Sequence, residues 1–180
     1  MYHISDDPRT KRSARRICKA LMECAGHKPF AEVTVSNLNK EHGISRTTFY
    51  RLFDNTVDVL EYACEQMGQG VLLHIAGGSP KDLTIQAITA LTDHRELIEL
   101  LYKSGHLNIF LQVQEKYLPL SQLAEGLDSG PCSSYFHKLL ARMIPMAIEI
   151  WMSEGQKDSP EEVYEKLCHS IRILGQWFSE

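Results

Sequence analysis

Residues 34–53 read TVSNLNKEHGISRTTFYRLF, a stretch that predicts a helix-turn-helix. Thr34 can cap a first short helix, because its hydroxyl can accept a bond from a backbone N–H two or three residues further on. Gly43 ends that helix, since glycine adopts the left-handed conformation found just past a helix C-terminus without a Cβ clash. Ser45 then begins a second helix, whose aromatic residues at one-turn spacing are expected to pack onto the first.

The second helix leaves a polar face that suits DNA. Arginine can bind guanine with two hydrogen bonds, threonine offers a hydroxyl and a methyl group to base edges, and a tyrosine hydroxyl can hold a phosphate. Two short amphipathic helices around a glycine also form corners of helical proteins that do not bind DNA. Of the residues predicted to contact DNA, Arg46 and Thr47 would read bases, Thr34, Thr48, Tyr50 and Arg51 would hold phosphates, and Ser36 would do either.

The motif resembles a known family. The run GISRTTFYRLFDN at 43–55, with VTVSNLNKEHG at 33–43 before it, resembles the DNA-binding domain of the TetR family of transcriptional regulators. In that family a capped helix, a glycine turn and a TFYxxF recognition helix follow one another, and the resemblance is strong from Phe30 to Leu60. Many members carry a phosphate-contacting lysine at the start of the next helix, where this chain has Thr56.

Charge is unevenly distributed along the 180 residues, whose net charge is −4. Residues 1–55 hold ten Lys and Arg against six Asp and Glu, or +4, while residues 56–180 hold nine against seventeen, or −8. The basic part contains the motif, so an acidic body behind a basic head would orient the molecule on a polyanion. A positive charge of only +4 implies that DNA binding also needs specific contacts and dimerisation.

Apolar spacing predicts helices along the whole chain and no strand. A polar leader precedes a helix that ends near Gly26 and has a basic face formed by Arg9, Lys11, Arg12, Arg15, Arg16 and Lys19. A long helix over 57–75 is the covalent lever between the motif and the remainder, and Gly68 and Gly70 in it mark a bend, a close helix contact or nothing functional. After a break at 77–80, helical patterns cover 81–92, 96–104 and 107–124, and 126–131 form a loop.

We therefore predict an all-α fold with an N-terminal three-helix DNA-binding domain, residues 1–55, and a helical-bundle domain for ligand sensing and dimerisation, residues 56–180. Apolar and aromatic side chains of the middle helices are candidates for lining a ligand pocket, although such stripes more often form core. The predicted pocket residues are Leu97, Leu101, Tyr102, Phe110 and Tyr117.

Two long helices close the chain, and Ser159 and Pro160 are placed as the cap and first-turn residue of the second. Pro145 inside the first predicts a kink, at a cost of about 3 kcal/mol unless packing compensates. Both apolar stripes are wide, which favours burial against a second copy of the chain, and the TetR resemblance implies a four-helix dimer interface here. The predicted interface residues are Phe136, Leu140, Met143, Ala147, Trp151, Leu167, Ile171, Leu174 and Phe178.

Other functions find little support in the sequence. Five cysteines without a CxxC pair, together with the lack of a signal peptide or a bilayer-spanning apolar run, favour free thiols in a reducing cytoplasm. No phosphate-binding glycine loop or HExxH motif is present, and Cys132 with His137 lacks the third member of a nucleophilic site. We predict no enzyme, catalytic residue, cofactor or metal site, although ligands that converge only in the fold leave a metal sensor open.

We interpret the chain as a TetR-like regulator, a repressor that binds double-stranded DNA as a homodimer and, in one version, is released by a small-molecule effector. A two-fold dimer sets its recognition helices about 34 Å apart, one DNA turn, so the operator should be palindromic. The alternatives are a helical dimer that keeps the fold but acts through a protein partner, and a redox or metal sensor that uses cysteine and histidine.

Overall fold

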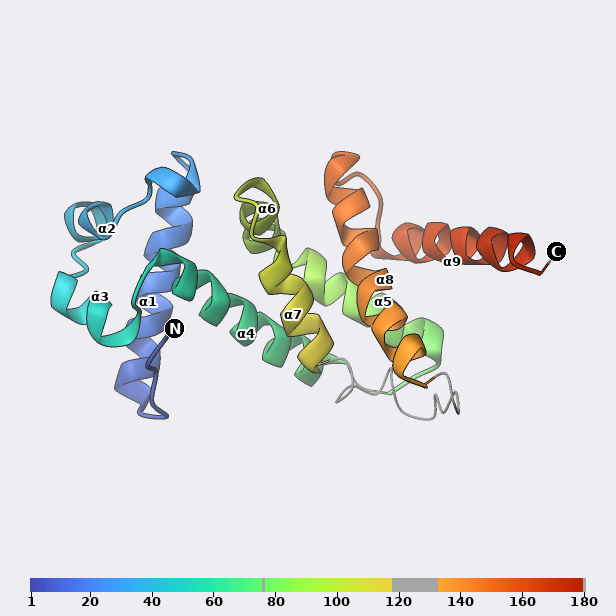
Figure 1. Cartoon of the computed structure of the whole chain (residues 1–180), viewed down its shortest axis with the longest axis horizontal. Helices are drawn as coiled ribbons and strands as arrows, with labels where there is room; N and C mark the ends of the chain where they lie inside the picture. Colours follow the sequence, from blue (N-terminus) through green and yellow to red (C-terminus); the bar gives the residue numbers. More distant parts are fainter. Residues whose placement is uncertain (76, 118–132, 180) are drawn as a thin grey trace. The chain divides into compact units, whose positions relative to one another are not determined.

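The computed structural model describes residues 1–75, 77–117 and 133–179. These residues form nine α-helices and one short 3₁₀ helix, with no strand among them, so the predicted all-α class is confirmed (Figure 1). In chain order they are α1 (Pro8–Ala25), η1 (Phe30–Glu32), α2 (Val35–His42), α3 (Arg46–Leu52), α4 (Thr56–His74), α5 (Pro80–Thr92), α6 (Arg95–Lys103), α7 (Leu107–Tyr117), α8 (Ser133–Ser153) and α9 (Pro160–Trp177). The predicted continuation to 124 and the loop at 126–131 lie outside the described residues.

One compact unit contains Met1–Met67 and Glu96–Phe110. In it α1 packs against α2 and α3, which also pack against each other. The side chains without exposed surface in this unit include Ile17, Leu38, Phe49, Phe53, Leu60 and Phe110. The predicted three-helix head is therefore present as α1 to α3, joined in the same unit by the first part of α4.

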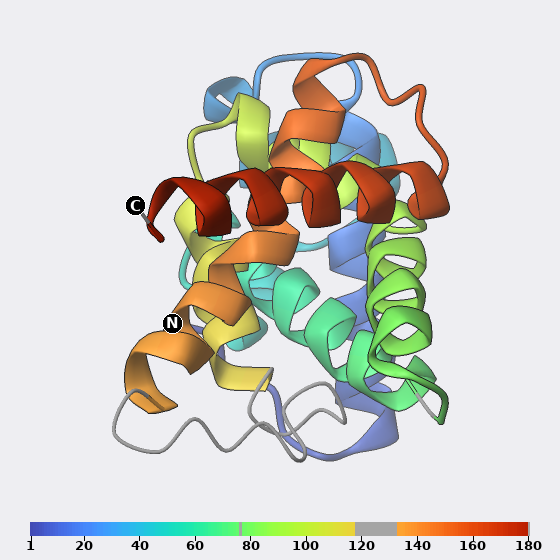
Figure 2. The same ribbon diagram turned by 90° about the vertical axis from the view of Figure 1, so that its right-hand side faces the viewer.

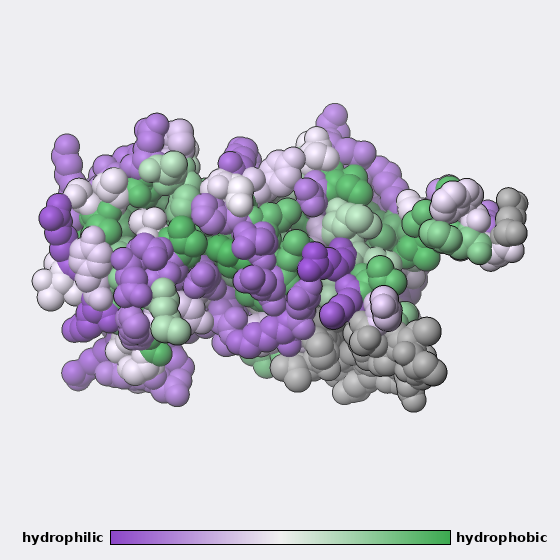
Figure 3. Space-filling model, in the orientation of Figure 1, coloured by the Kyte–Doolittle hydropathy of each residue, from purple (hydrophilic) through white to green (hydrophobic). Residues whose placement is uncertain are grey.

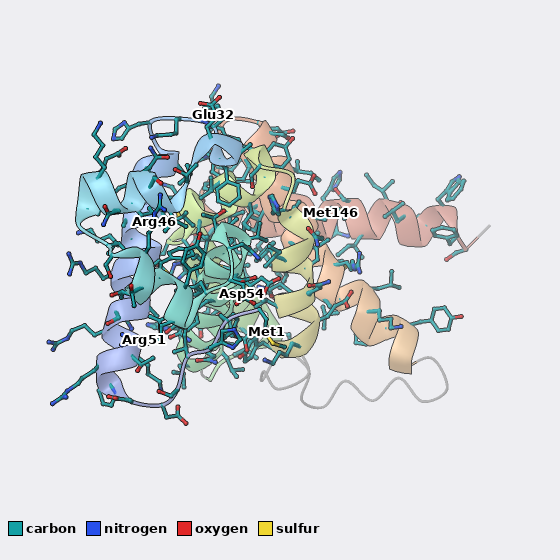
Figure 4. The ribbon with its side chains drawn as sticks, turned by 60° about the vertical axis from the view of Figure 1, so that its left-hand side comes forward. Met1, Glu32, Arg46, Arg51, Asp54 and Met146 are labelled. Atoms are coloured by element: carbon teal, nitrogen blue, oxygen red, sulfur yellow. The ribbon has the colours of Figure 1, made fainter. Side chains whose placement is uncertain are left out.

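The N-terminal leader is packed onto this unit. Tyr2 forms an isolated antiparallel bridge with Phe53, and the His3 backbone N–H donates to the Leu52 carbonyl at 2.8 Å. The Tyr2 ring centroid lies 5.4 Å from that of Tyr62, and Figure 4 shows Met1 close to the segment that follows α3. Few apolar residues precede α1, so the sequence pattern gave no signal for this pairing.

The second compact unit contains Gly68–Arg95 and the described residues from Leu111 onward. In it α5 packs against α8 and α9, and Figure 2 shows α9 crossing α8. Ser159 caps α9 as predicted, since its Oγ accepts the Glu162 backbone N–H at 3.2 Å. Pro145 is buried inside α8, and the helix continues through it.

The two units are groups of residues that pack together, whereas the predicted division after Asn55 separates a DNA-binding part from a ligand-sensing part. That functional division stays a prediction. α4 contributes residues to both units without a break. None of the described helices combines the length and the apolar character needed to cross a membrane.

α4 contacts α7 at a position that excludes a larger residue than glycine. A Cβ atom on Gly68 would lie 2.5 Å from Val113 Cγ1 and 2.8 Å from Tyr117 Cδ2. A Cβ atom on Gly70 would meet no atom within 4 Å. Of the readings left open by the sequence, a close helix contact is therefore confirmed for Gly68.

Replacing each of these glycines with alanine separates helix propensity from packing. Gly70→Ala should raise the free energy of unfolding by about 0.5–1 kcal/mol, because alanine is the better helix former. Gly68→Ala gains the same propensity but overpacks the contact with α7, at a cost of about 1–3 kcal/mol. Urea denaturation should therefore place Gly68→Ala below Gly70→Ala, and equal stability of the two variants would contradict the close contact.

Candidate nucleic-acid interface

The first helix of the motif, α2, is fixed at both ends. Thr34 Oγ1 accepts the Asn37 backbone N–H at 3.2 Å, and Asn37 Oδ1 accepts the Thr34 N–H at 2.9 Å. At the other end Gly43 has φ 66°, in the left-handed region, and the Ile44 N–H donates to the Leu38 carbonyl at 3.2 Å. The predicted cap and glycine stop are confirmed.

The recognition helix, α3, is held by a buried aromatic edge. The helix begins after Ser45 as predicted, and Ser45 caps it, because Ser45 Oγ accepts the Thr48 backbone N–H at 3.1 Å. Phe49 in the helix and Phe53 just after it have no exposed surface, and their ring centroids lie 5.9 Å apart. The Phe53 ring also lies 5.9 Å from that of Tyr62 on α4. The other side of α3 is therefore left to solvent.

The turn from α3 to α4 is capped in both directions. Asn55 Oδ1 accepts the backbone N–H groups of Val57 at 2.8 Å and Asp58 at 3.1 Å. Asp58, which is 3% exposed, accepts in return the N–H groups of Asp54 at 2.8 Å and Asn55 at 3.3 Å. This reciprocal capping box fixes the start of α4 against the end of the recognition helix.

The exposed side of the motif carries the residues predicted to touch bases. Arg46 Nη2 donates to Ser36 Oγ at 2.8 Å, so α2 and α3 are joined on their outer surface. Arg51, from the same helix as Arg46 (Figure 4), forms no hydrogen bond or ion pair within the part of the chain that the structure describes. The residues of α3 that are exposed include Arg46, Thr47, Tyr50 and Arg51.

Two of the predicted phosphate contacts have hydroxyl groups that already form hydrogen bonds within the motif. Thr34 Oγ1 donates to Asn37 Oδ1 at 2.8 Å, and Thr48 Oγ1 shares a 2.8 Å hydrogen bond with Ser45 Oγ. A phosphate oxygen only accepts, so the Thr34 hydroxyl must release its internal bond before it can donate to DNA. Tyr50, by contrast, is 55% exposed.

Part of the basic face of α1 is used within the unit. Lys11 and Lys19 pair with acidic side chains at 2.9 and 3.7 Å, and exposed pairs of this kind contribute little. Arg16 Nη2 donates to the His42 carbonyl at 3.0 Å, which ties α1 to the end of α2. The basic residues of α1 whose side chains form neither an ion pair nor a hydrogen bond within the described residues are Arg9, Arg12 and Arg15.

The residues predicted to line a ligand pocket occupy different environments. Leu97, Leu101 and Phe110 are buried, whereas Tyr102 is 44% exposed. Tyr117 belongs to the second unit, where its ring lies against Gly68. The ligand pocket stays a prediction.

The predicted dimer-interface residues divide between the two terminal helices. Every residue of α9 from 169 to the end of the helix is exposed, and Figure 3 shows hydrophobic side chains uncovered there. A cavity of about 360 Å³ lies between α8 and α9, with Ile150 and Leu167 among its lining residues. Ala147 and Trp151 are buried, Phe136, Leu140, Met143 and Leu167 are half-buried, and Ile171, Leu174 and Phe178 are exposed.

The thiols of the core are poorly suited to redox chemistry. Burial raises the pKa of Cys18 and of Cys64 to about 12, so both stay protonated and weakly nucleophilic. Cys168 is half-buried and has a free thiol, and Cys132 lies outside the described residues.

These features define an all-α protein with a helix-turn-helix head and a helical body. A structure described as a TetR transcriptional regulator from Streptococcus agalactiae 2603V matches 89% of this chain and 94% of its own, with a TM-score of 0.66 and 14% sequence identity. The Lin0861 structure from Listeria innocua matches 96% of both chains, with a TM-score of 0.79 and 19% identity. No family sequence model and no curated protein matches the chain. The chain thus has the fold of TetR regulators.

Asp58→Ala removes the acceptor of two backbone N–H groups at the start of α4. It should lower the free energy of unfolding by about 2–3 kcal/mol, because hydrogen bonds to a charged group contribute about 1.5–3 kcal/mol and the donors stay unpaired. Glu61→Ala makes the same charge change one turn along α4 and should stay within about 0.5 kcal/mol of the wild type. Thermal denaturation compares the two variants, and an equal loss in both would assign the effect to charge rather than to capping.

Proposed function

We propose that this chain is a TetR-like transcriptional regulator that binds double-stranded DNA through α2 and α3, as a homodimer on a palindromic operator, and acts as a repressor. The observation that carries the proposal is the recognition helix, which Phe49 and Phe53 lock on one side while the other side exposes a row of polar side chains. A helix presented in this way suits the major groove. Repression follows where the bound dimer occupies DNA that the transcription machinery needs.

Arg46 is the residue that we propose to read sequence. It is the first residue of α3, and the N-terminal side chains of a recognition helix contact base edges. Its bond to Ser36 orients the guanidinium without burying it, and four N–H donors remain to bind guanine O6 and N7. Thr47 is the second proposed base contact.

We propose that DNA phosphates bind beside Arg46 and Thr47, along the exposed side of α3. Tyr50 and Arg51 are the principal proposed contacts, because neither polar group is engaged elsewhere in the described residues. Thr34 and Thr48 join them only if the internal hydrogen bonds of their hydroxyl groups open. Thr56 replaces the lysine that many TetR proteins use, which makes the contributions of Tyr50 and Arg51 larger here.

The homodimer is proposed from the end of α9. Ile171, Leu174 and Phe178 fall on one face at helical spacing, and Leu174 is 53% exposed within one chain. Burying an apolar side chain of this size contributes about 1.5–3 kcal/mol. Two-fold symmetry doubles the number of side chains buried, which favours association of two copies.

A small-molecule effector is the remaining part of the proposal. Such a ligand shifts DNA binding only if its affinity differs between two conformations of the protein. α4 carries residues of both units without a break, so it is the covalent element that a ligand bound in the body would have to move. The proposed pocket residues are those predicted from the sequence.

Substitutions in α3 should separate base reading from phosphate contact. On an operator selected from a random duplex pool by the wild type, Arg46→Ala should cost about 1–3 kcal/mol and relax preference at one base pair per half-site. Tyr50→Phe should weaken binding to all duplexes alike, because a phosphate contact carries no sequence information. Fluorescence anisotropy on operator and scrambled duplexes measures both effects.

Salt provides the control for this experiment. Arg51→Ala should lower the slope of log affinity against log salt by about one per phosphate contact, whereas Arg95→Ala, a surface arginine at the start of α6, should leave the slope unchanged. If Arg46→Ala left operator affinity and base preference unaltered, the assignment of α3 would fall. If the wild type selected no duplex, the protein-partner alternative would replace this proposal.

Dimerisation should be lost when the α9 face is made acidic. The double variant Ile171→Glu/Leu174→Glu should sediment as a folded monomer and lose operator affinity, because buried charges without partners oppose association. Leu73→Glu, at an exposed leucine of α4, makes a similar surface change outside these helices and should remain dimeric. A monodisperse dimer of the double variant would overturn the interface.

A further inference from the structure

Three side chains with metal-binding chemistry meet where the end of α1 faces the end of α2. Cys24 comes from the last turn of α1, and Glu41 and His42 are the last residues of α2. One ligand atom from each of the three lies within 4.8 Å of the others. Cys24 has no exposed surface, whereas Glu41 and His42 reach solvent, so the cluster opens outward.

We propose that Cys24, Glu41 and His42 bind a transition-metal ion of the Zn²⁺ class. Thiolate, imidazole and carboxylate are the donors that such ions take, and three protein ligands with one open position are a common arrangement. Zinc bond lengths of about 2.0–2.3 Å put tetrahedral ligands roughly 3.3–3.8 Å apart. Cys24 Sγ and Glu41 Oε2 are already 3.4 Å apart, so these two need no movement to share an ion.

Glu23 supports this assignment from the last turn of α1. Its Oε2 lies 3.3 Å from Nδ1 of His42. Histidine ligands characteristically give one ring nitrogen to a carboxylate and the other to the metal. With Nδ1 on Glu23, Nε2 is the nitrogen of His42 left for the metal, and Glu23 is a positioning residue for this ring.

Lys28 completes the charge balance of the site. Its Nζ lies 3.2 Å from Glu41 Oε1, on the carboxylate oxygen that does not face the thiol. A Cys24 thiolate with the carboxylates of Glu23 and Glu41 carries three negative charges, which a divalent ion and the Lys28 ammonium together neutralise. Without the ion, the Cys24 thiol donates its proton in a hydrogen bond to Glu41 Oε2. Metal binding would release that proton to solvent, because the thiolate is the metal ligand.

A bound metal ion would tie α1 to the last residues of α2, directly before the turn at Gly43. The Arg16 bond to the His42 carbonyl already joins these helices, and the metal adds a second link beside it. The bound ion would therefore stiffen the head that positions α3. This consequence for DNA rests on the proposed function, whereas the metal site itself does not.

Cobalt titration of the full-length, metal-free chain tests the site, because Co²⁺ reports a thiolate ligand by charge-transfer absorption and tetrahedral geometry by its visible bands. The wild type should show both signals at one equivalent, and Zn²⁺ should bleach them by displacement. Cys24→Ser should abolish the charge-transfer band, and Cys168→Ser should retain it. A wild-type spectrum without that band, or a band that survives in Cys24→Ser, would overturn the proposal.

Affinity measurements on the other residues guard against variants that fail to fold. Glu23→Gln should weaken Co²⁺ binding by about 10–100-fold, and His42→Gln and Glu41→Gln should weaken it further, while His94→Gln should leave it unchanged. Zn²⁺ should raise the midpoint of thermal unfolding of the wild type and not that of His42→Gln. Unaltered binding in His42→Gln would refute the site. Intact metal binding without DNA binding would refute the proposed function alone.

Discussion

The contact between Phe49, Phe53 and Tyr62 determines what the head of this molecule can present. The three rings are buried at 5.9 Å separations and join α3, the turn after it and α4. Because a helix has only one side opposite its buried edge, this contact, together with the buried Leu52, leaves Arg46 and Arg51 facing solvent. The proposed interface for DNA is thus a consequence of core packing, and the caps of Ser45 and Asn55 only set where α3 and α4 begin.

Features with short-range causes could be predicted from the sequence, and features with long-range causes could not. Thr34, Gly43 and Ser45 act on backbone within a few residues of themselves, so their roles follow from residue type and spacing. The Asn55–Asp58 capping box also had a local signal, an N-cap residue with an acidic residue three positions on, which the apolar periodicity of α4 overshadowed. The features without any local signal are the Arg46–Ser36 bond, the Tyr2–Phe53 bridge and the cluster of Cys24, Glu41 and His42, because each joins residues from different elements. Gly68 is itself a local signal for a close contact, but only the fold identifies α7 as its partner.

The exposed end of α9 sets a second constraint on the molecule. The rings of Trp177 and Phe178 meet edge to face with centroids 4.9 Å apart, yet both are among the most exposed apolar residues described. Val163, near the start of the same helix, is buried against its own chain. A helix that is buried at one end and apolar but uncovered at the other is stable in water chiefly when another surface covers it. Under the proposed function, association and operator binding are then linked, since only a dimer presents two copies of α3.

The end of α2 is one point, besides the direct packing of α1 on α3, at which changes in α1 can reach α3. Arg16 holds the His42 carbonyl, Asn39 Nδ2 holds the Ile44 carbonyl at 3.1 Å, and the left-handed Gly43 lies between them. These bonds leave the turn few ways to deform, so a shift of α1 relative to α2 must be passed on to the start of α3. A metal ion at Cys24 would act on the same junction. Under the proposed function, regulation at this junction needs only a small difference in the free energy of two arrangements of α1 and α2, without any change in the residues proposed to touch DNA.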